Sequence, residues 1–243
     1  MHNTVSVIVP VHGHAEYLAE CLGSILNQRL SRTMSLEILV VVDGDPDALT
    51  VAMPYNKKGV GILNLTKNFG AYPAMNTGLQ FTSGNHVTFC GADDTMHPDR
   101  CITLSRVINR HGDLCITNSF NTLIDVESNK TRDTDFGVLG GVYMWSRSML
   151  ETLGGFRDWP VSADSEMFHR AKLFGAFGRI VRKELYNYRR HAEQLTSREE
   201  SKSGSAMRNK YERMIRELKV AEKIKPKLGE VDLYLPGHIL KSS

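Results

Sequence analysis

The sequence predicts an α/β fold in which a mostly parallel, mixed central sheet is flanked by helices. Segments 5–11 and 38–42 are almost entirely apolar and β-branched, which is typical of parallel strands buried on both faces. The first is followed by a polar turn and by apolar residues at helical spacing, and the second runs into an acidic turn that contains Gly44 and Pro46. Strands that alternate with helices in this way form βαβ units. We therefore expect a single Rossmann-like domain.

The first half of the chain contains the clearest elements. A helix with Leu18 and Leu22 on its apolar face should end near Asn27, and a second helix should be closed by Ser83-Gly84 as its C-cap. Pro98 fits the first turn of a third helix. The predicted strands are 5–11, 37–43, 61–65 and 87–90. The second helix is predicted at 71–81, and the third follows Pro98.

The second half has weaker patterns. Glycines 154 and 155 should stop a short helix, and polar residues 125–135 should form a hairpin tip or a mobile loop. We expect strands at 114–117 and 140–145, and helices at 149–153 and 166–174.

The C-terminal region is basic, with ten Lys or Arg against five Asp or Glu in residues 198–227. After a polar linker at 197–205, an apolar stripe of two heptads indicates a helix that docks onto the protein's own body, although contact with a membrane or with nucleic acid remains open. No donor motif lies beyond His191, so we expect the tail from Ser203 onward to be dispensable for the donor site but not for the acceptor or for solubility. The stripe consists of Met207, Tyr211, Met214, Leu218 and Ala221.

Composition narrows the function classes. The chain has 243 residues and a net charge of +3, and no apolar run reaches the roughly 18 residues that would span a membrane, so we expect a cytoplasmic protein, peripheral at a membrane if the tail binds lipid. The four cysteines show no CxxC spacing, so we expect reduced core residues and no zinc site.

Asp93 and Asp94 follow the strand at 87–90 and precede a helix. In open α/β sheets, ligands bind beyond the carboxyl ends of the strands. Two carboxylates there predict Mg²⁺ or Mn²⁺ that carries a phosphate group. The alternative is that both acids only complement the dipole of the following helix.

Together, six segments resemble the inverting family 2 glycosyltransferases of GT-A fold. The resemblance covers about residues 4–197, which we expect to be one domain with a nucleotide-sugar half (about 1–100) and an acceptor half (about 101–197), followed by a linker and helical tail at 198–243. The segments are Val9-Pro-Val11, Val41-Val-Asp-Gly44, Asn68-Phe-Gly70 with Asn76-Thr-Gly78, Ala92-Asp-Asp94 with Pro98-Asp99, Gly154-Gly-Phe156, and Ser162-Ala-Asp164 with Glu166.

The resemblance implies a nucleotide-sugar donor, most simply a UDP-sugar, with Mn²⁺ or Mg²⁺. Asp43 would accept a hydrogen bond from uracil N3. Asp93 would hold the metal against the diphosphate, and Asp94 would support it or contact the sugar. The other residues implied in donor binding are Pro10, Val11 and His12 at the uracil and ribose, with Lys67, Asn68, Gly70, Asn76 and Ala92.

Two departures from the family pattern affect the metal and the diphosphate. Gly91 stands where the family's DxD motif has its first acid, and His191 matches a histidine that ligates metal in some members, so it could take that place. Met75 stands where many members have Arg, and Lys67 could compensate.

Asp164 matches the family's general base, although Ala163 replaces the usual Glu before it. The alternative role for Asp164 is an N-cap of the helix at 166–174. Trp145 and Trp159 could form a stacking floor for the acceptor, or simply be buried. The acceptor hydroxyl could belong to a glycan, a lipid-linked sugar or modified nucleic acid. Oligomerisation and a non-catalytic module that binds nucleotide sugar or nucleic acid also remain open.

Overall fold

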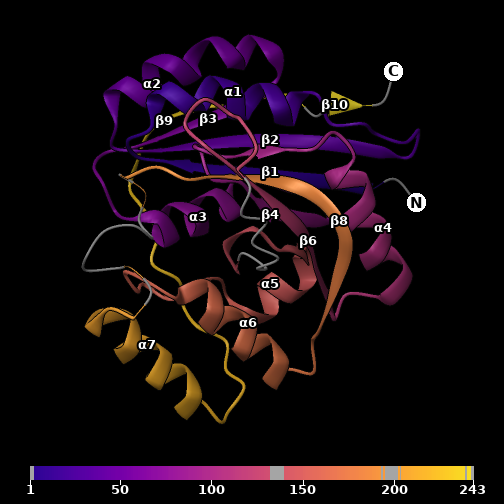
Figure 1. The fold of residues 1–243 in the computed structure, drawn as a ribbon, viewed down its shortest axis with the longest axis vertical. Helices are drawn as coiled ribbons and strands as arrows, with labels where there is room; N and C mark the ends of the chain where they lie inside the picture. The colour runs from indigo at the N-terminus through magenta and orange to yellow at the C-terminus, as the bar shows by residue number, and fades with distance from the viewer. Residues whose placement is uncertain are drawn as a thin grey trace.

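A ten-stranded mixed sheet forms the centre of the protein (Figure 1). The computed structural model describes residues 3–131, 140–192, 194, 202, 204–238 and 240–241. Strand β1 (Asn3–Val11) pairs in parallel with β2 (Met34–Asp43) and β4 (His86–Phe89), and β2 pairs in parallel with β3 (Val60–Leu65). This parallel core contains all four strands predicted for the first half of the chain.

The second half of the chain extends the sheet. Strand β7 (Met144–Ser146) is antiparallel to both β4 and β6 (Cys115–Ile124), and β8 (Phe177–Arg189) runs parallel to β6. The short β5 (Thr95–Met96) is antiparallel to β8. The sheet is thus mixed, as predicted; the pairings within the β1–β4 core are parallel, whereas most of the pairings that extend it are antiparallel.

The helices cover both faces of the sheet and enclose two cores (Figure 1). Alternate residues of β1 point to opposite faces, so that Val5, Val7 and Val9 enter one core and Ile8 the other. The first core is covered by α1 (Ala15–Leu26), α2 (Pro46–Ala52), the 3-10 turn η1 (Met53–Lys58) and α4 (Arg100–His111), and the second by α3 (Ala71–Gln80), α5 (Arg147–Leu153) and α6 (Ala163–Leu173).

Four predicted boundaries need correction. Helix α3 ends at Gln80, so Ser83-Gly84 is not its cap; Gly84 is required because a Cβ there would lie 2.8 Å from the backbone nitrogen of Ser6. Pro98 precedes α4, which begins at Arg100. Residues 140–145 are the 3-10 turn η2 (Gly140–Val142) and the start of β7. Helix α6 begins at Ala163 rather than Glu166.

Strand β8 was not predicted. Residues 177–184 are mostly exposed and include Arg179, Arg182 and Lys183, so their pattern does not resemble a buried strand. Only its last residues turn inward, where Leu185, Tyr186 and Arg189 are buried. The strand matters because its end delivers His191 to the edge of the sheet where the predicted acids lie.

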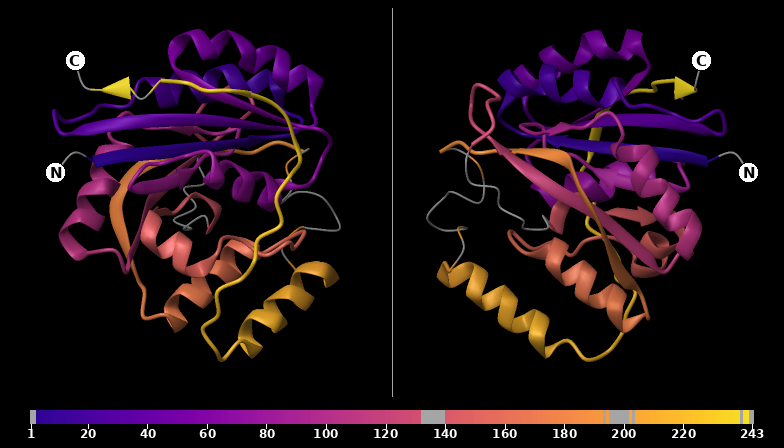
Figure 2. Two further views of the ribbon diagram at one scale, coloured as in Figure 1. Left: turned by 180° about the vertical axis from the view of Figure 1, so that it is seen from behind. Right: turned by 45° about the vertical axis from the view of Figure 1, so that its right-hand side comes forward.

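The C-terminal region returns to the sheet (Figure 2). Helix α7 (Ala206–Glu217) contacts α6, and its Tyr211 ring lies 4.7 Å from the Trp159 ring, but the helix ends before Leu218 and Ala221 of the predicted stripe. Strands β9 (Val231–Leu235) and β10 (Leu240–Lys241) then pair with β3 and β2. The tail thus adds strands to the half of the sheet that we expect to bind the donor. Its dispensability for the donor site and the domain boundary near residue 197 both remain predictions.

Two further expectations can be compared with the described residues. All four cysteines are buried and free, as predicted. Loop residues 125–131 form a turn closed by a bridge between Ile124 and Lys130, whereas the rest of the predicted loop and most of the predicted linker at 197–205 lie outside the described residues. Within the described part of the chain, no helix combines the length and the apolar character needed to pass through a bilayer.

Candidate active site

A pocket of about 380 Å³ opens beyond the carboxyl ends of β1, β2 and β4. It brings together residues that are far apart in the sequence, because parallel strands end at the same edge of the sheet. The first turns of α3 and α6 complete its walls. Ten of the predicted site residues line it: Pro10, Val11, His12, Asp43, Asn68, Gly70, Ala92, Asp93, Asp94 and Asp164.

Asp43 ends β2 and is held by backbone. Its two carboxylate oxygens accept hydrogen bonds of 2.8 Å from the N–H groups of Phe69 and Gly70. Desolvation raises the pKa of this carboxyl group, and the two hydrogen bonds oppose that shift. A carboxylate has about four acceptor positions, so Asp43 can still bind the edge of a ligand in the pocket.

Asp93 and Asp94 are neighbours with different surroundings. Asp94 is 4% exposed and accepts hydrogen bonds from the Tyr186 hydroxyl (2.7 Å) and the Arg189 N–H (2.8 Å). Desolvation, and then the charge of Asp93, raise the pKa of Asp94 well above its usual value. Asp94 therefore fastens β8 to the site, whereas Asp93 is half-buried and faces His191, whose Nε2 lies 3.0 Å from Asp93 Oδ2.

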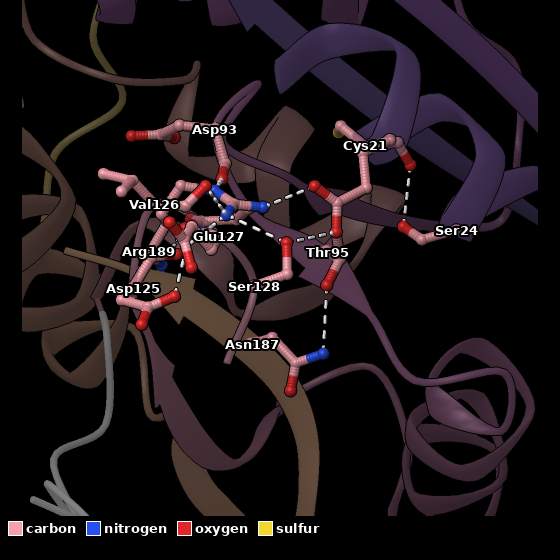
Figure 3. A network of polar contacts seen from close by, with 12 residues as sticks. Cys21, Ser24, Asp93, Thr95, Asp125, Val126, Glu127, Ser128, Asn187 and Arg189 are labelled. Atoms are coloured by element: carbon pink, nitrogen blue, oxygen red, sulfur yellow. Dashed lines mark hydrogen bonds and ion pairs between the residues drawn. The ribbon is translucent and has the colours of Figure 1, made fainter. Parts of the chain in front are cut away.

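Arg189, two residues before His191, bonds to Asp93 and to the turn that contains Ser128 (Figure 3). It is fully buried; its Nε donates to the Asp93 carbonyl oxygen (2.7 Å), and its guanidinium also contacts Glu20 (2.6 Å). Its Nη1 also donates to the turn at 125–128, where the acceptors are two backbone carbonyl oxygens and the Ser128 hydroxyl. Because one buried cation joins α1, the acidic loop and this turn, the end of β8 has little freedom to move. The sequence analysis missed Arg189, although it lies two residues before His191.

His14 was also missed. One ligand atom each from His14, Asp93 and His191 lie within 4.8 Å of one another, and the His14 and His191 rings are 4.6 Å apart. His14 belongs to the His12-Gly-His14 turn that links β1 to α1. Two histidines in a turn after the first strand were a signal that the sequence analysis treated only as a loop.

Asp164 faces the pocket from the first turn of α6. Its Oδ1 accepts a 2.9 Å hydrogen bond from the Tyr72 hydroxyl of α3. Desolvation and the neighbouring Asp164 charge raise the pKa of Tyr72 well above its usual value, so this phenol remains a proton donor. Asp164 is not an N-cap, because Ser162 occupies that position. The positive end of the helix dipole complements the Asp164 carboxylate.

Several predicted residues lie elsewhere. Asn76 is buried, and its amide bonds the backbone of Phe156 and Lys227, so it fixes the turn after α5 instead of lining the pocket. Lys67 is exposed, with its Nζ 5.3 Å from the centre of the Phe69 ring. Trp145 is 1% exposed within the second core, so it cannot be an acceptor floor. Trp159 packs on Tyr211 of α7.

Sequence comparisons find similar proteins. The family model described as Glycosyl transferase family 2 matches residues 6–174. Glycosyltransferase GlyA of Streptococcus pneumoniae is 37% identical over 122 residues, covering 48% of this chain and 17% of GlyA. Glycosyltransferase GlyG of the same species is 30% identical over 125 residues, covering 50% of this chain and 40% of GlyG. The chain therefore matches less than half the length of either relative.

Solved structures share the fold. S. aureus TarS 1–349 in complex with UDP-GlcNAc superposes with a TM-score of 0.66 at 19% identity, covering 79% of this chain and 60% of that one. Mannosyltransferase PcManGT from Pyrobaculum calidifontis, in complex with GDP-Man and Mn²⁺, gives 0.65 at 20% identity, covering 77% and 57%. At these identities the likeness concerns the fold alone, and it confirms the predicted GT-A architecture.

Proposed function

Because the chain belongs to glycosyl transferase family 2, whose model matches most of its length, we propose that it transfers a sugar from a nucleotide-sugar to an acceptor hydroxyl. The donor that we propose is a UDP-sugar, and the displacement inverts the anomeric carbon. The observation that carries this proposal is the convergence of Asp43, Asp93 and Asp164 on one pocket. A module that only binds nucleotides has no need of the third carboxylate.

The proposed roles follow from position. Asp43 lines the pocket together with Pro10, Val11 and His12, where it can accept a hydrogen bond from a uracil N–H. Asp93 and His191 supply an oxygen and a nitrogen at about the spacing of two ligands of one ion. A divalent ion there would neutralise charge on the departing diphosphate. TarS was solved with UDP and with UDP-GlcNAc, and PcManGT was solved with GDP-Man. These two folds therefore carry different nucleotides, and the nucleobase that this chain binds has to be tested directly.

Asp164 would act as the general base. Its carboxylate would accept the proton of the acceptor hydroxyl while the hydroxyl oxygen attacks the anomeric carbon from the face opposite the departing diphosphate. The Tyr72 hydroxyl donates to Oδ1 and so orients the carboxylate, leaving Oδ2 for the acceptor. A single displacement of this kind inverts the configuration of the anomeric carbon.

The acceptor and the cellular setting are proposed only by class. The acceptor hydroxyl would belong to a glycan, a lipid-linked sugar or modified nucleic acid. Basic residues of α7 and the segment after it are available to contact an anionic membrane or nucleic acid. We place the protein in the cytoplasm or at the membrane surface.

Calorimetry tests the donor assignment. We expect UDP to bind more tightly with Mn²⁺ than with EDTA, and Asp93→Ala to remove most of that difference. Equal UDP affinity under all three conditions would contradict the metal assignment, and a purine diphosphate that binds more tightly than UDP would contradict the role of Asp43. Slow hydrolysis of a UDP-sugar with Mn²⁺ separates an enzyme from a binding module, which would leave the donor intact.

A further inference from the structure

His14 lies beside the proposed metal ligands without any other evident function. Its Nδ1 is buried and has no hydrogen-bond partner among the described residues. A buried nitrogen left in this state costs about 1–3 kcal/mol. The His14 side chain also lies in the wall of the pocket.

The backbone conformation of His14 is strained. His14 has a φ of 59°, in the left-handed region that residues with a Cβ seldom adopt, and its side chain makes no capping bond to α1 that would compensate. On either side the turn is fixed, by the 2.6 Å bond from the Gly13 N–H to Asp45 and by α1. Strain of this kind concentrates at functional sites.

Gly91 leaves the position of the family's first DxD acid without a side chain. A Cβ at position 91 would lie 2.7 Å from Asp93 Oδ1 and 2.7 Å from Asp94 Oδ2. A side chain at position 91 would therefore require the carboxylates of Asp93 and Asp94 to shift, and Asp94 is held by Tyr186 and Arg189. The turn between β1 and α1 instead brings a ligand atom of His14 within 4.8 Å of those of Asp93 and His191.

We propose that His14 is a third protein ligand of the metal, so that two imidazoles and the Asp93 carboxylate bind the ion. This inference rests on the proposed function and specifies its metal site. Carboxylate-rich sites suit Mg²⁺, whereas imidazoles favour the transition metals, whose affinity rises from Mn²⁺ to Co²⁺. The site should therefore discriminate against Mg²⁺ more strongly than one built from carboxylates alone.

Metal affinity tests this directly, measured by calorimetry with UDP present. Loss of a hydrogen-bond partner behind a ligand already weakens metal binding about 10–100-fold, so His14→Ala should raise the Kd for Mn²⁺ at least about tenfold. His111→Ala, which removes an exposed histidine at the end of α4, is the matched control and should bind as wild type. His14→Asp should bind Mn²⁺ better than His14→Ala and should shift the preference toward Mg²⁺.

Pulsed electron paramagnetic resonance of Mn²⁺ in the wild-type protein with UDP gives a second measurement that needs no variant. We expect couplings to two imidazole nitrogens. A single coupling, or a Kd for His14→Ala within twofold of wild type, would overturn the role of His14 and leave the proposed function standing. Wild-type protein that binds no divalent metal in the presence of UDP would overturn both.

Discussion

The two edges of the parallel core carry similar polar residues but use them differently. At the amino edge, Glu37 accepts hydrogen bonds from the Ser6 hydroxyl (2.6 Å) and from the backbone N–H groups of Ser83 (2.8 Å) and Gly84 (3.1 Å). Arg147 closes the same corner by donating to the Gly84 carbonyl oxygen (2.7 Å). These groups satisfy one another within the protein.

At the carboxyl edge, polar groups face a pocket and keep acceptor positions free. Asp43 uses two positions on the backbone, Asp164 uses one on Tyr72, and His14 Nδ1 uses none. The difference teaches that a ligand site is distinguished by hydrogen-bonding positions that remain unused within the protein. The polarity of the residues alone does not distinguish the two edges. Substitutions at the carboxyl edge should therefore change turnover with little effect on stability, and those at the amino edge should do the reverse.

The largest expected effect is at Asp164. Asp164→Asn keeps the shape and the bond from Tyr72, but the amide cannot take a proton, so kcat should fall about 10²–10⁴-fold. UDP and Mn²⁺ affinity and the melting temperature should stay near wild type, as calorimetry and thermal unfolding would measure. Transfer within about threefold of wild type, a difference below one kcal/mol, would remove Asp164 from the role of base.

At the amino edge, Glu37→Ala should destabilise the fold by about 1–3 kcal/mol, because the buried Ser6 hydroxyl loses its acceptor. The melting temperature and the urea midpoint would report this. Glu37→Gln retains one carbonyl acceptor and should lose less. A fall in kcat/KM of the folded variant beyond about twofold would mean that the two edges are not independent.

His86 gives the amino edge a pH dependence. Desolvation lowers the pKa of His86 to about 4, below its usual value of about 6.5, so the folded state holds the neutral ring, with Nδ1 near Asn3 and Ser105. The contribution of the neutral His86 ring to the free energy of unfolding is complete above pH 6.5 and is lost as the pH falls toward 4. The loss should reach about 2 kcal/mol at pH 5.

Urea unfolding at pH 7.5 and pH 5 would measure that dependence. His86→Asn can offer an acceptor to Asn3 and Ser105 without titrating, so its stability should fall less between the two pH values. If the two proteins lost equal stability, the slope would arise from other groups.

The smallest expected effect is at Tyr72. Tyr72→Phe removes one hydrogen bond to Asp164 and should lower kcat about 3–10-fold, the range for a bond worth about 0.5–1.5 kcal/mol. KM for the donor should not change, because Tyr72 orients the base and does not line the nucleotide end of the pocket. An unchanged kcat would show that α6 alone orients Asp164.

Sequence patterns predicted the residues whose position follows from a local element. Asp43 ends β2 and Asp93 lies in the loop after β4, and both strands have strong apolar patterns, so their place at one edge follows from parallel pairing. Position in the sequence does not determine side-chain direction, and the pattern could not separate Asp93, which faces the pocket, from Asp94, which turns inward to β8.

The residues that were missed depend on contacts between distant segments. His14 meets His191 only because β8, with an exposed and basic outer face, pairs with β6 and β5. Asn76 was assigned to the donor because a buried amide that bonds backbone looks the same in sequence as one that binds a ligand. Strands β9 and β10 were missed since short exposed segments owe their conformation to the neighbours they join.

The pairing of β9 with β3 also bears on aggregation during folding. Ile62 pairs with Leu235, so the two strands meet only after about 170 residues of intervening chain have been arranged. Until then β3, with Val60, Ile62, Leu63 and Leu65, presents unpaired backbone groups on an apolar edge, which other chains can join. Once docked, β9 replaces that edge with one that is partly exposed and carries Asp232. The C-terminal strand thus competes with neighbouring molecules for the same row of hydrogen bonds, and dilution favours the intramolecular partner.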